Sequence, residues 1–148
     1  MFDTNIFNEI LKGKWDLSSL GNSKESFWAT HVQEGEINNT PDPVKKEQLL
    51  KIFKMVSNQT STSSAVWGRS LWGRSEFPKD RGELFNQIKA DLDRKNKNKK
   101  NNTEDALIAD TSIKKNFSLV THDSDLFYVV TKLKGKALNF FQLIDEVG

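Results

Sequence analysis

The chain contains no cysteine and only two histidines, His31 and His122, among its 148 residues. The absence of cysteine excludes disulfide bonds, thiol catalysis and cysteine-ligated zinc, and two histidines are too few for a histidine-rich metal site. No apolar run approaches the ~18 residues that a membrane-spanning helix needs, and the first residues lack the pattern of a signal peptide. We therefore expect a cytoplasmic protein with no membrane segment.

A strong excess of charge of one sign is also missing. The chain has 22 Lys and Arg against 20 Asp and Glu, so its formal net charge is +2, and any attraction to nucleic acid has to come from local patches. The sequence has no G-x-x-x-x-G-K segment, which excludes a P-loop enzyme. Its length fits one domain with a sizeable core, so we expect a single domain over 1–148.

What the chain does contain is an alternation of helix-like and strand-like segments. Apolar residues at helical spacing predict helices over 6–11, over 43–56 and from Asp80 past Leu92. Short apolar runs predict strands at 26–32, 117–121 and 136–140, and residues 57–64 are expected to form a polar connector. Strands separated by helices favour an α/β fold with a parallel sheet covered on both faces.

Local capping patterns mark three predicted helix starts. Thr30 and Gln33 have the T-x-x-Q spacing of a capping box, in which each side chain satisfies a free backbone N–H. Asp42 followed by Pro43 is a helix cap with proline at the first helical position. A further helix is predicted after the basic segment 94–102, and Thr103 is expected to cap its start.

Carboxylates recur at these predicted strand ends and helix starts: Asp3, Glu34, Glu36, Asp105 and Asp123. In open parallel α/β sheets such positions share one edge, where ligands bind. Taken singly, Asp105 could complement a helix dipole and Asp123 could make a turn. Taken together, clustered carboxylates repel one another unless a cation or shared protons neutralise them. Oxygen ligands without thiols suit Mg²⁺ or Mn²⁺.

Four segments, in this order, resemble the acidic blocks of a PIN-domain nuclease: "FDTNIF" (2–7), "THVQEGEI" (30–37), "EDALIADTSI" (104–113) and "LVTHDSDL" (119–126). The resemblance covers almost the whole chain. It implies a single PIN domain over 1–148, with a three-layer α/β/α sandwich around a central parallel β-sheet. It also implies Mg²⁺ or Mn²⁺ as cofactor and cleavage of single-stranded RNA. Many small relatives are ribonuclease toxins, so the implied partners are single-stranded RNA, an antitoxin protein and a second copy in a homodimer.

The resemblance also assigns roles by position. The four catalytic, metal-binding acids are Asp3, Glu36, Asp105 and Asp123, with Asp125 as an accessory metal ligand. Asn5 and Thr121 are the expected accessory residues that orient Asp3 and Asp123. Two departures stand out: only Met1 and Phe2 precede Asp3, so the first strand is unusually short or the true start lies upstream. Asp110 takes a place where a small or polar residue is usual, and we expect it to be a solvated helix charge.

The second acid requires a choice between Glu34 and Glu36. On a helix the two lie ~200° apart and cannot both face the sheet edge. Glu36 precedes Ile37, which matches the Glu-plus-aliphatic pair of the family's block, and it lies one turn past Val32. We therefore favour Glu36. His122, beside Asp123, is either a proton shuttle or a loop histidine with no catalytic role, and the second reading is favoured.

A repeat at 67–75, "WGRSLWGRS", is a candidate RNA contact. Trp67 and Trp72 could stack on bases while Arg69 and Arg74 meet phosphates. The alternative is that the tryptophans belong to the core and that the glycines let helices approach closely.

The basic loop expected at 94–102, "RKNKNKKNN", is a second candidate. Nothing in it can bury apolar area, so we expect a mobile segment, most simply a solvated linker. However, it leads directly into Asp105, and Lys97, Lys99 and Lys100 would guide a polyanion to that acid.

Two rival function classes were weighed. "LVTHDSDLF" also resembles the D-x-D nucleophile loop of haloacid-dehalogenase-type phosphatases, but that loop normally opens the fold, and only residues 126–148 follow Asp125. The stronger rival is a non-catalytic PIN-like module that binds RNA or a partner protein.

Overall fold

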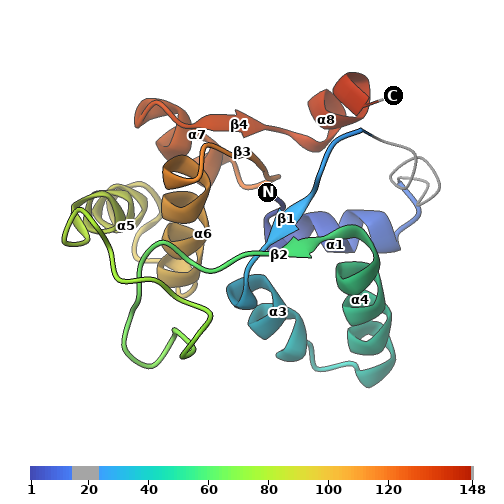
Figure 1. Ribbon diagram of the computed structural model, residues 1–148. Helices are drawn as coiled ribbons and strands as arrows, with labels where there is room; N and C mark the ends of the chain where they lie inside the picture. The colour runs from blue at the N-terminus through green and yellow to red at the C-terminus, as the bar shows by residue number, and fades with distance from the viewer. Residues whose placement is uncertain (15–23, 148) are drawn as a thin grey trace.

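The computed structural model describes residues 1–14 and 24–147, and Figure 1 shows short strands in the middle of the molecule with helices around them. The elements are α1 (Thr4–Leu11), β1 (Trp28–Ala29), α3 (His31–Asn38), α4 (Pro43–Val56), β2 (Asn58–Gln59), α5 (Glu83–Asn96), α6 (Asn102–Lys114), β3 (Ser118–Val120), α7 (Ser124–Lys132), β4 (Lys136–Leu138) and α8 (Phe140–Val147). This mixture of helices and short parallel strands confirms the general α/β class.

The regular strands form two parallel pairs. β1 pairs with β2, and β3 pairs with β4. The first three residues lie between the pairs: the Phe2 N–H donates to the Trp28 carbonyl (3.0 Å), and the Asp3 N–H donates to the Val120 carbonyl (2.9 Å). Phe2 forms only an isolated parallel bridge with Val120, because Asp3 already caps α1. The expected single central sheet is therefore not seen as one continuous element in the described residues.

Hydrophobic side chains form two clusters, one on each group of helices. The first includes Phe2, Phe7 and Phe53 and is built largely from α1, α4 and α8. The second includes Leu92 and Leu107 and is built largely from α5, α6 and α7. In Figure 1, α5 and α6 lie to one side of the strands, and α1 and α4 lie to the other. Among the described residues, no helix has both the length and the apolar character needed to cross a membrane.

The helix starts with the strongest local patterns form as expected. Thr30 and Gln33 make the full capping box at the start of α3, and Asp42 accepts from the N–H groups of Val44 and Lys45 at the start of α4. Helix α4 spans the expected residues 43–56. These signals act within four residues, so they do not depend on the rest of the fold.

Several sequence-based boundaries were wrong. The strands expected over 26–32 and 136–140 are shorter, Trp28–Ala29 and Lys136–Leu138, because α3 begins at His31 and α8 begins at Phe140. Thr103 does not cap α6, because that helix already begins at Asn102 with Asn101 in the N-cap position. The basic loop is shorter than 94–102, because α5 continues to Asn96, and the chain then turns through positive φ angles at residues 97 and 98. The connector 57–64 contains β2, whose two residues pair with β1.

Asp110 is not a solvated helix charge. Its side chain is fully buried, and it pairs with Lys114 (2.8 Å) and accepts a hydrogen bond from the Ser64 hydroxyl (2.8 Å). The expectation failed because residues 105–112 of α6 are all buried, so a charge on this helix has to be paired internally.

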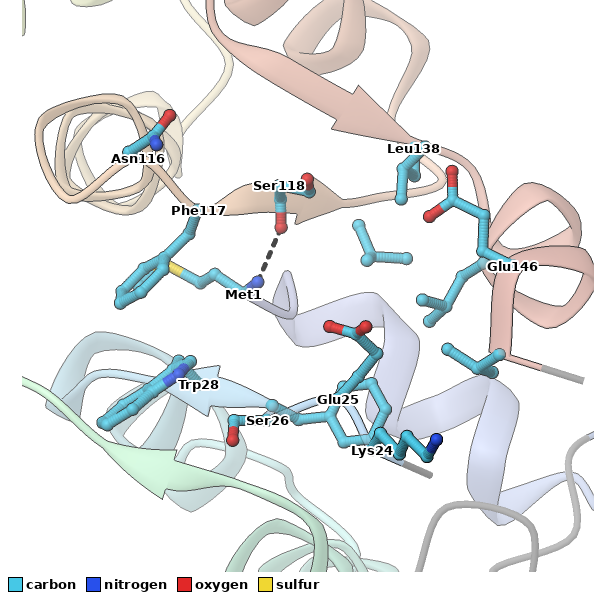
Figure 2. Close-up of a pocket in the computed structure, with 14 residues that line it drawn as sticks. Met1, Lys24, Glu25, Ser26, Trp28, Asn116, Phe117, Ser118, Leu138 and Glu146 are labelled. Carbon is cyan, nitrogen blue, oxygen red and sulfur yellow. Dashed lines mark hydrogen bonds between the residues drawn. The ribbon is translucent and has the colours of Figure 1, made fainter. Parts of the chain in front are cut away.

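A cavity of about 440 Å³ lies beside β1, β3 and β4, and it is lined mainly by residues that precede or begin β1 and β3, by the last residues of β3 and β4, and by part of α8. Figure 2 shows the Met1 amino group there, donating to the Ser118 carbonyl at 2.6 Å. Burial lowers the pKa of this amine from 8.0 to about 5. The candidate acids follow the carboxyl ends of the strands.

Candidate active site

Asp3 is held in a fixed orientation at the start of α1. Its side chain is buried, Oδ1 accepts from the Thr4 N–H (2.7 Å), and Oδ2 accepts from the Asn5 amide (2.8 Å) and the Thr121 hydroxyl (2.6 Å). Burial raises the pKa of Asp3 above its ordinary value, against the opposing effect of the Thr121 and Thr4 hydrogen bonds. Asn5 and Thr121, the two residues expected to orient the acids, thus both contact Asp3.

Glu36 reaches the same place from α3. It accepts a short hydrogen bond from the Thr4 hydroxyl. Burial, together with the nearby charges of Asp3 and Glu104, raises the pKa of Glu36 to about 7. Glu34 points elsewhere and forms an ion pair with Arg74 (2.7 Å), as expected for two residues ~200° apart on a helix.

Asp105 enters from the first turn of α6 and is only 4% exposed. Its Oδ1 lies 3.5 Å from the amide nitrogen of Asn101, while its Oδ2 receives no hydrogen bond from any described residue. Burial, followed by the charge of Asp3, raises the pKa of Asp105 to about 8, and the charges of Glu36 and Asp123 act in the same direction.

Asp123 is the N-cap residue of α7. Its Oδ1 accepts from the N–H groups of Asp125 (2.9 Å) and Leu126 (3.1 Å), and its Oδ2 accepts from Lys99 Nζ (2.7 Å). Burial acts to raise the pKa of Asp123, but the bond from Lys99 and these backbone bonds outweigh it and hold the pKa below its ordinary value. Lys99 Nζ also lies 3.8 Å from Asp105 Oδ2.

Four polar residues lie between successive acids, and we call this arrangement the acid ring. Thr4 links Asp3 to Glu36. Asn101 lies 3.5 Å from Asp105 Oδ1, and its side chain acts to lower the pKa of Glu36. Lys99 links Asp105 to Asp123. Thr121 closes the ring, because its hydroxyl accepts from the Asp123 N–H (3.0 Å) and donates to Asp3.

No group of three or more metal-ligating side chains in the described part of the chain closes around one point. The contacts give a physical reason: the Lys99 ammonium occupies the space between Asp105 and Asp123. Even so, the residues fit a hard cation. Asp105 Oδ2 is a buried oxygen with no hydrogen-bond donor among the described residues, and burial, with a smaller contribution from neighbouring carboxylates, raises the pKa values of three of the four carboxyls.

Two residues near the ring face away from it. Asp125 directs its carboxylate toward Lys95 of α5, at 3.8 Å, so the structure does not bring it into the ring. His122 Nε2 lies 3.9 Å from Glu9, and its ring packs beside Phe140. These contacts favour a loop histidine over a proton shuttle.

The candidate RNA contacts fall in two places. Trp67 and Trp72 are 99% and 94% exposed, so the core alternative for them is wrong. Arg69 pairs with Glu104 at 3.1 Å and Arg74 pairs with Glu34. On the shortened loop, Lys97, Lys99 and Lys100 are all exposed, and of these Lys99 pairs with Asp123.

Sequence reasoning missed Asn101 and Glu104. Asn101 stands at the N-cap of α6, a position asparagine favours, but its side chain reaches toward Glu36 and Asp105. Glu104 precedes Asp105, and its charge contributes to the raised pKa of Glu36. Its position next to Asp105, a predicted site acid, was the sequence feature that could have identified it.

The chain was compared with models of protein families, with curated proteins and with solved structures, and none of the three comparisons found a significant match.

Proposed function

We propose that the protein is a metal-dependent endoribonuclease of PIN-like fold that cleaves single-stranded RNA with Mg²⁺ or Mn²⁺. The observation that carries the proposal is the ring in which Asp3, Glu36, Asp105 and Asp123 arrive from four separate segments. Helix capping can account for a carboxylate taken by itself. It does not account for four carboxylates close together, three of which have raised pKa values.

The fold part of the proposal rests on the first three residues. Their hydrogen bonds to Trp28 and Val120 support reading the strand segments as one parallel sheet in the order β2, β1, 1–3, β3, β4. The two hydrophobic clusters would then be the two helical layers of the α/β/α sandwich.

The roles of the residues follow from their contacts. Asp3, Glu36, Asp105 and Asp123 would hold the metal, and Thr121 and Asn5 keep Asp3 in position. When bound, Mg²⁺ or Mn²⁺ activates water and stabilises the leaving oxygen of the phosphodiester. Lys99 would then leave Asp123 and become available to a phosphate oxygen. That the RNA is a toxin's target, with an antitoxin or a homodimer as partner, rests on the resemblance, and an antitoxin gene beside this one would support it.

The second candidate is a non-catalytic PIN-like module that binds RNA or protein. The observation in its favour is Lys99, which already balances part of the charge of Asp105 and Asp123. A protein whose acids already pair with a lysine has less need of a metal ion.

Cleavage of a labelled single-stranded RNA with Mg²⁺ or Mn²⁺ tests the proposal, comparing wild type with Asp123→Asn. Asparagine keeps an oxygen that can cap α7, so the variant should fold, while cleavage should fall by about 100-fold or more. Asp145→Asn, which removes an exposed carboxylate on α8, is the matched control and should cut like wild type. Equal cleavage by wild type and Asp123→Asn, or no cleavage and no Mn²⁺ binding by wild type, would favour the non-catalytic module.

A further inference from the structure

Three exposed aromatic rings recur at a spacing of five residues along 67–77: Trp67, Trp72 and Phe77, which are 99%, 94% and 85% exposed. The residue two positions after each ring is a cation: Arg69, Arg74 and Lys79. The repeat therefore continues past "WGRSLWGRS" into "FPK". We call residues 65–79 the aromatic segment. Rings this exposed add little to the stability of the fold, and such a cluster marks a contact with another molecule.

The backbone of the aromatic segment displays the two tryptophans in the same way. The Arg69 N–H donates to the Val66 carbonyl, and the Arg74 N–H donates to the Leu71 carbonyl, both at 3.1 Å. Each bond closes a turn with tryptophan second and glycine third, and both glycines have positive φ (75° and 74°), as a type II turn requires. Trp67 and Trp72 thus stand at the tips of two equivalent turns.

The aromatic segment is tied to the elements that carry the acids. Arg69 pairs with Glu104, the residue before Asp105 in α6, and Arg74 pairs with Glu34, which shares α3 with Glu36. A groove of about 560 Å³ runs between the rings. The aromatic segment is therefore held against α3 and α6, the helices that carry Glu36 and Asp105, rather than on a free tether.

We propose that the aromatic segment is a base-stacking platform for single-stranded nucleic acid, on which Trp67, Trp72 and Phe77 stack with unpaired bases. The inference rests on the proposed function, because the strand held there would be the substrate of the acids. The alternation of ring and cation matches a polymer that alternates flat bases with anionic phosphates.

The platform is expected to bind bases by stacking, without selecting a particular nucleotide sequence. Every base has a flat face, so stacking tolerates all four. Arg69 and Arg74 are paired with Glu104 and Glu34 through partly exposed side chains, so the phosphates of a bound strand would compete with these two carboxylates for the arginines.

The test measures binding without cleavage, by fluorescence anisotropy of a short labelled oligouridylate in excess chelator. Replacing both rings, Trp67→Ala with Trp72→Ala, should weaken binding by about tenfold or more. Trp67→Phe with Trp72→Phe should bind within about threefold of wild type, because phenylalanine still stacks. Leu71→Ala is the matched control: Leu71 is 52% exposed in the same segment but has no ring, and its loss should change affinity little.

Equal affinity of wild type and the double alanine variant would overturn the platform. So would an equal loss in Leu71→Ala, because a general apolar contact points to a protein partner. A change of sedimentation in the double alanine variant with unchanged oligonucleotide binding would instead assign the rings to a second copy of the chain. If oligonucleotide binding depends on the aromatic side chains but the protein cleaves no RNA, the base-stacking platform is supported and only the proposed nuclease activity is rejected.

Discussion

Lys99 lies between two of the candidate catalytic acids, 2.7 Å from Asp123 and 3.8 Å from Asp105. The pairing outweighs the burial that acts to lower the pKa of Lys99, so this pKa is raised and the ammonium stays charged. At the scale of single residues, this one cation offsets part of the repulsion among the acids. In the function proposed above, it would also compete with the metal ion for Asp105 and Asp123.

Lys99→Met should separate these two effects. In chelator at pH 8 the variant should lose about 1 kcal/mol of unfolding free energy, because repulsion among the acids is no longer offset. Its Mn²⁺ affinity should rise by about tenfold, since no ammonium competes for the carboxylates. Calorimetry and chemical denaturation measure both, with Lys97→Met on the same loop as control. Unchanged Mn²⁺ affinity would show that Lys99 does not occupy the metal position.

The raised pKa values of Glu36 and Asp105 predict a pH dependence of stability. The pKa values rise from 4.5 to about 7 and from 3.8 to about 8. Between about pH 4 and pH 8 these two groups bind more protons in the folded protein than in the unfolded chain. Their contribution to the unfolding free energy is therefore full at low pH and is lost as the pH rises through the folded values.

Asp105→Asn should remove part of this loss. In chelator, the stability of the variant relative to wild type should be greater at pH 8 than at pH 5 by about 1–2 kcal/mol. The Met1 amine, whose pKa is lowered to about 5, acts in the opposite direction, but it is common to both proteins and cancels in the comparison. Chemical denaturation at the two pH values measures the difference. A difference that does not change with pH would contradict the burial of an ionisable Asp105.

At the scale of elements, the turn from α7 into β4 depends on a close approach at Gly135. A Cβ at this position would lie 2.7 Å from side-chain carbons of both Ile113 and Val130. The Gly135 N–H also donates to the Val130 carbonyl (2.9 Å), which ties the turn to the end of α7. The neighbouring side chains belong to the core of α6 and α7 and have little room to move.

Gly135→Ala should therefore lower the unfolding free energy by about 1–3 kcal/mol through overpacking. The control is Gly35→Ala in α3, where a Cβ would meet no described atom within 4 Å outside its own helix. That change should raise stability by about 0.5–1 kcal/mol, because alanine favours helix over glycine. Thermal unfolding of the two variants measures both changes in stability. Unchanged stability of Gly135→Ala would mean that the turn can relax around the added methyl group.

At the scale of the whole molecule, Phe2 connects the two pairs of strands, β1 with β2 and β3 with β4. Its N–H bonds to the Trp28 carbonyl and it bridges Val120. Its fully buried ring stacks on Phe27 (5.0 Å) and meets Phe7 edge-on (5.8 Å). The next residue is Asp3, so packing of this ring positions the first catalytic candidate.

Phe2→Ala should cost about 3–5 kcal/mol of unfolding free energy, because it empties a buried aromatic site. This is a large share of the total stability of a typical domain. Phe2→Leu should lose much less, since it keeps most of the apolar volume. Equilibrium unfolding in urea measures both, and a Phe2→Ala protein as stable as wild type would show that the two pairs of strands do not depend on this ring.

Features that act over a few residues were predictable from the sequence. The Thr30 capping box, the Asp42–Pro43 start and the extent of α4 were predictable because each involves neighbours within a turn or two. Asp105 was correctly expected in the first turn of its helix for the same reason.

Which side chains meet could not be predicted from the sequence, because the contacts join distant segments. Thr121 and Asp3 are 118 positions apart in the chain, and Lys99 and Asp123 are 24 apart. The burial of Asp110, the pairing of Lys99 and the outward display of Trp67 and Trp72 depend on what packs around each residue. Such burial and pairing depend on segments that are distant in the sequence and are brought together by folding. The local spacing of residues therefore does not predict them.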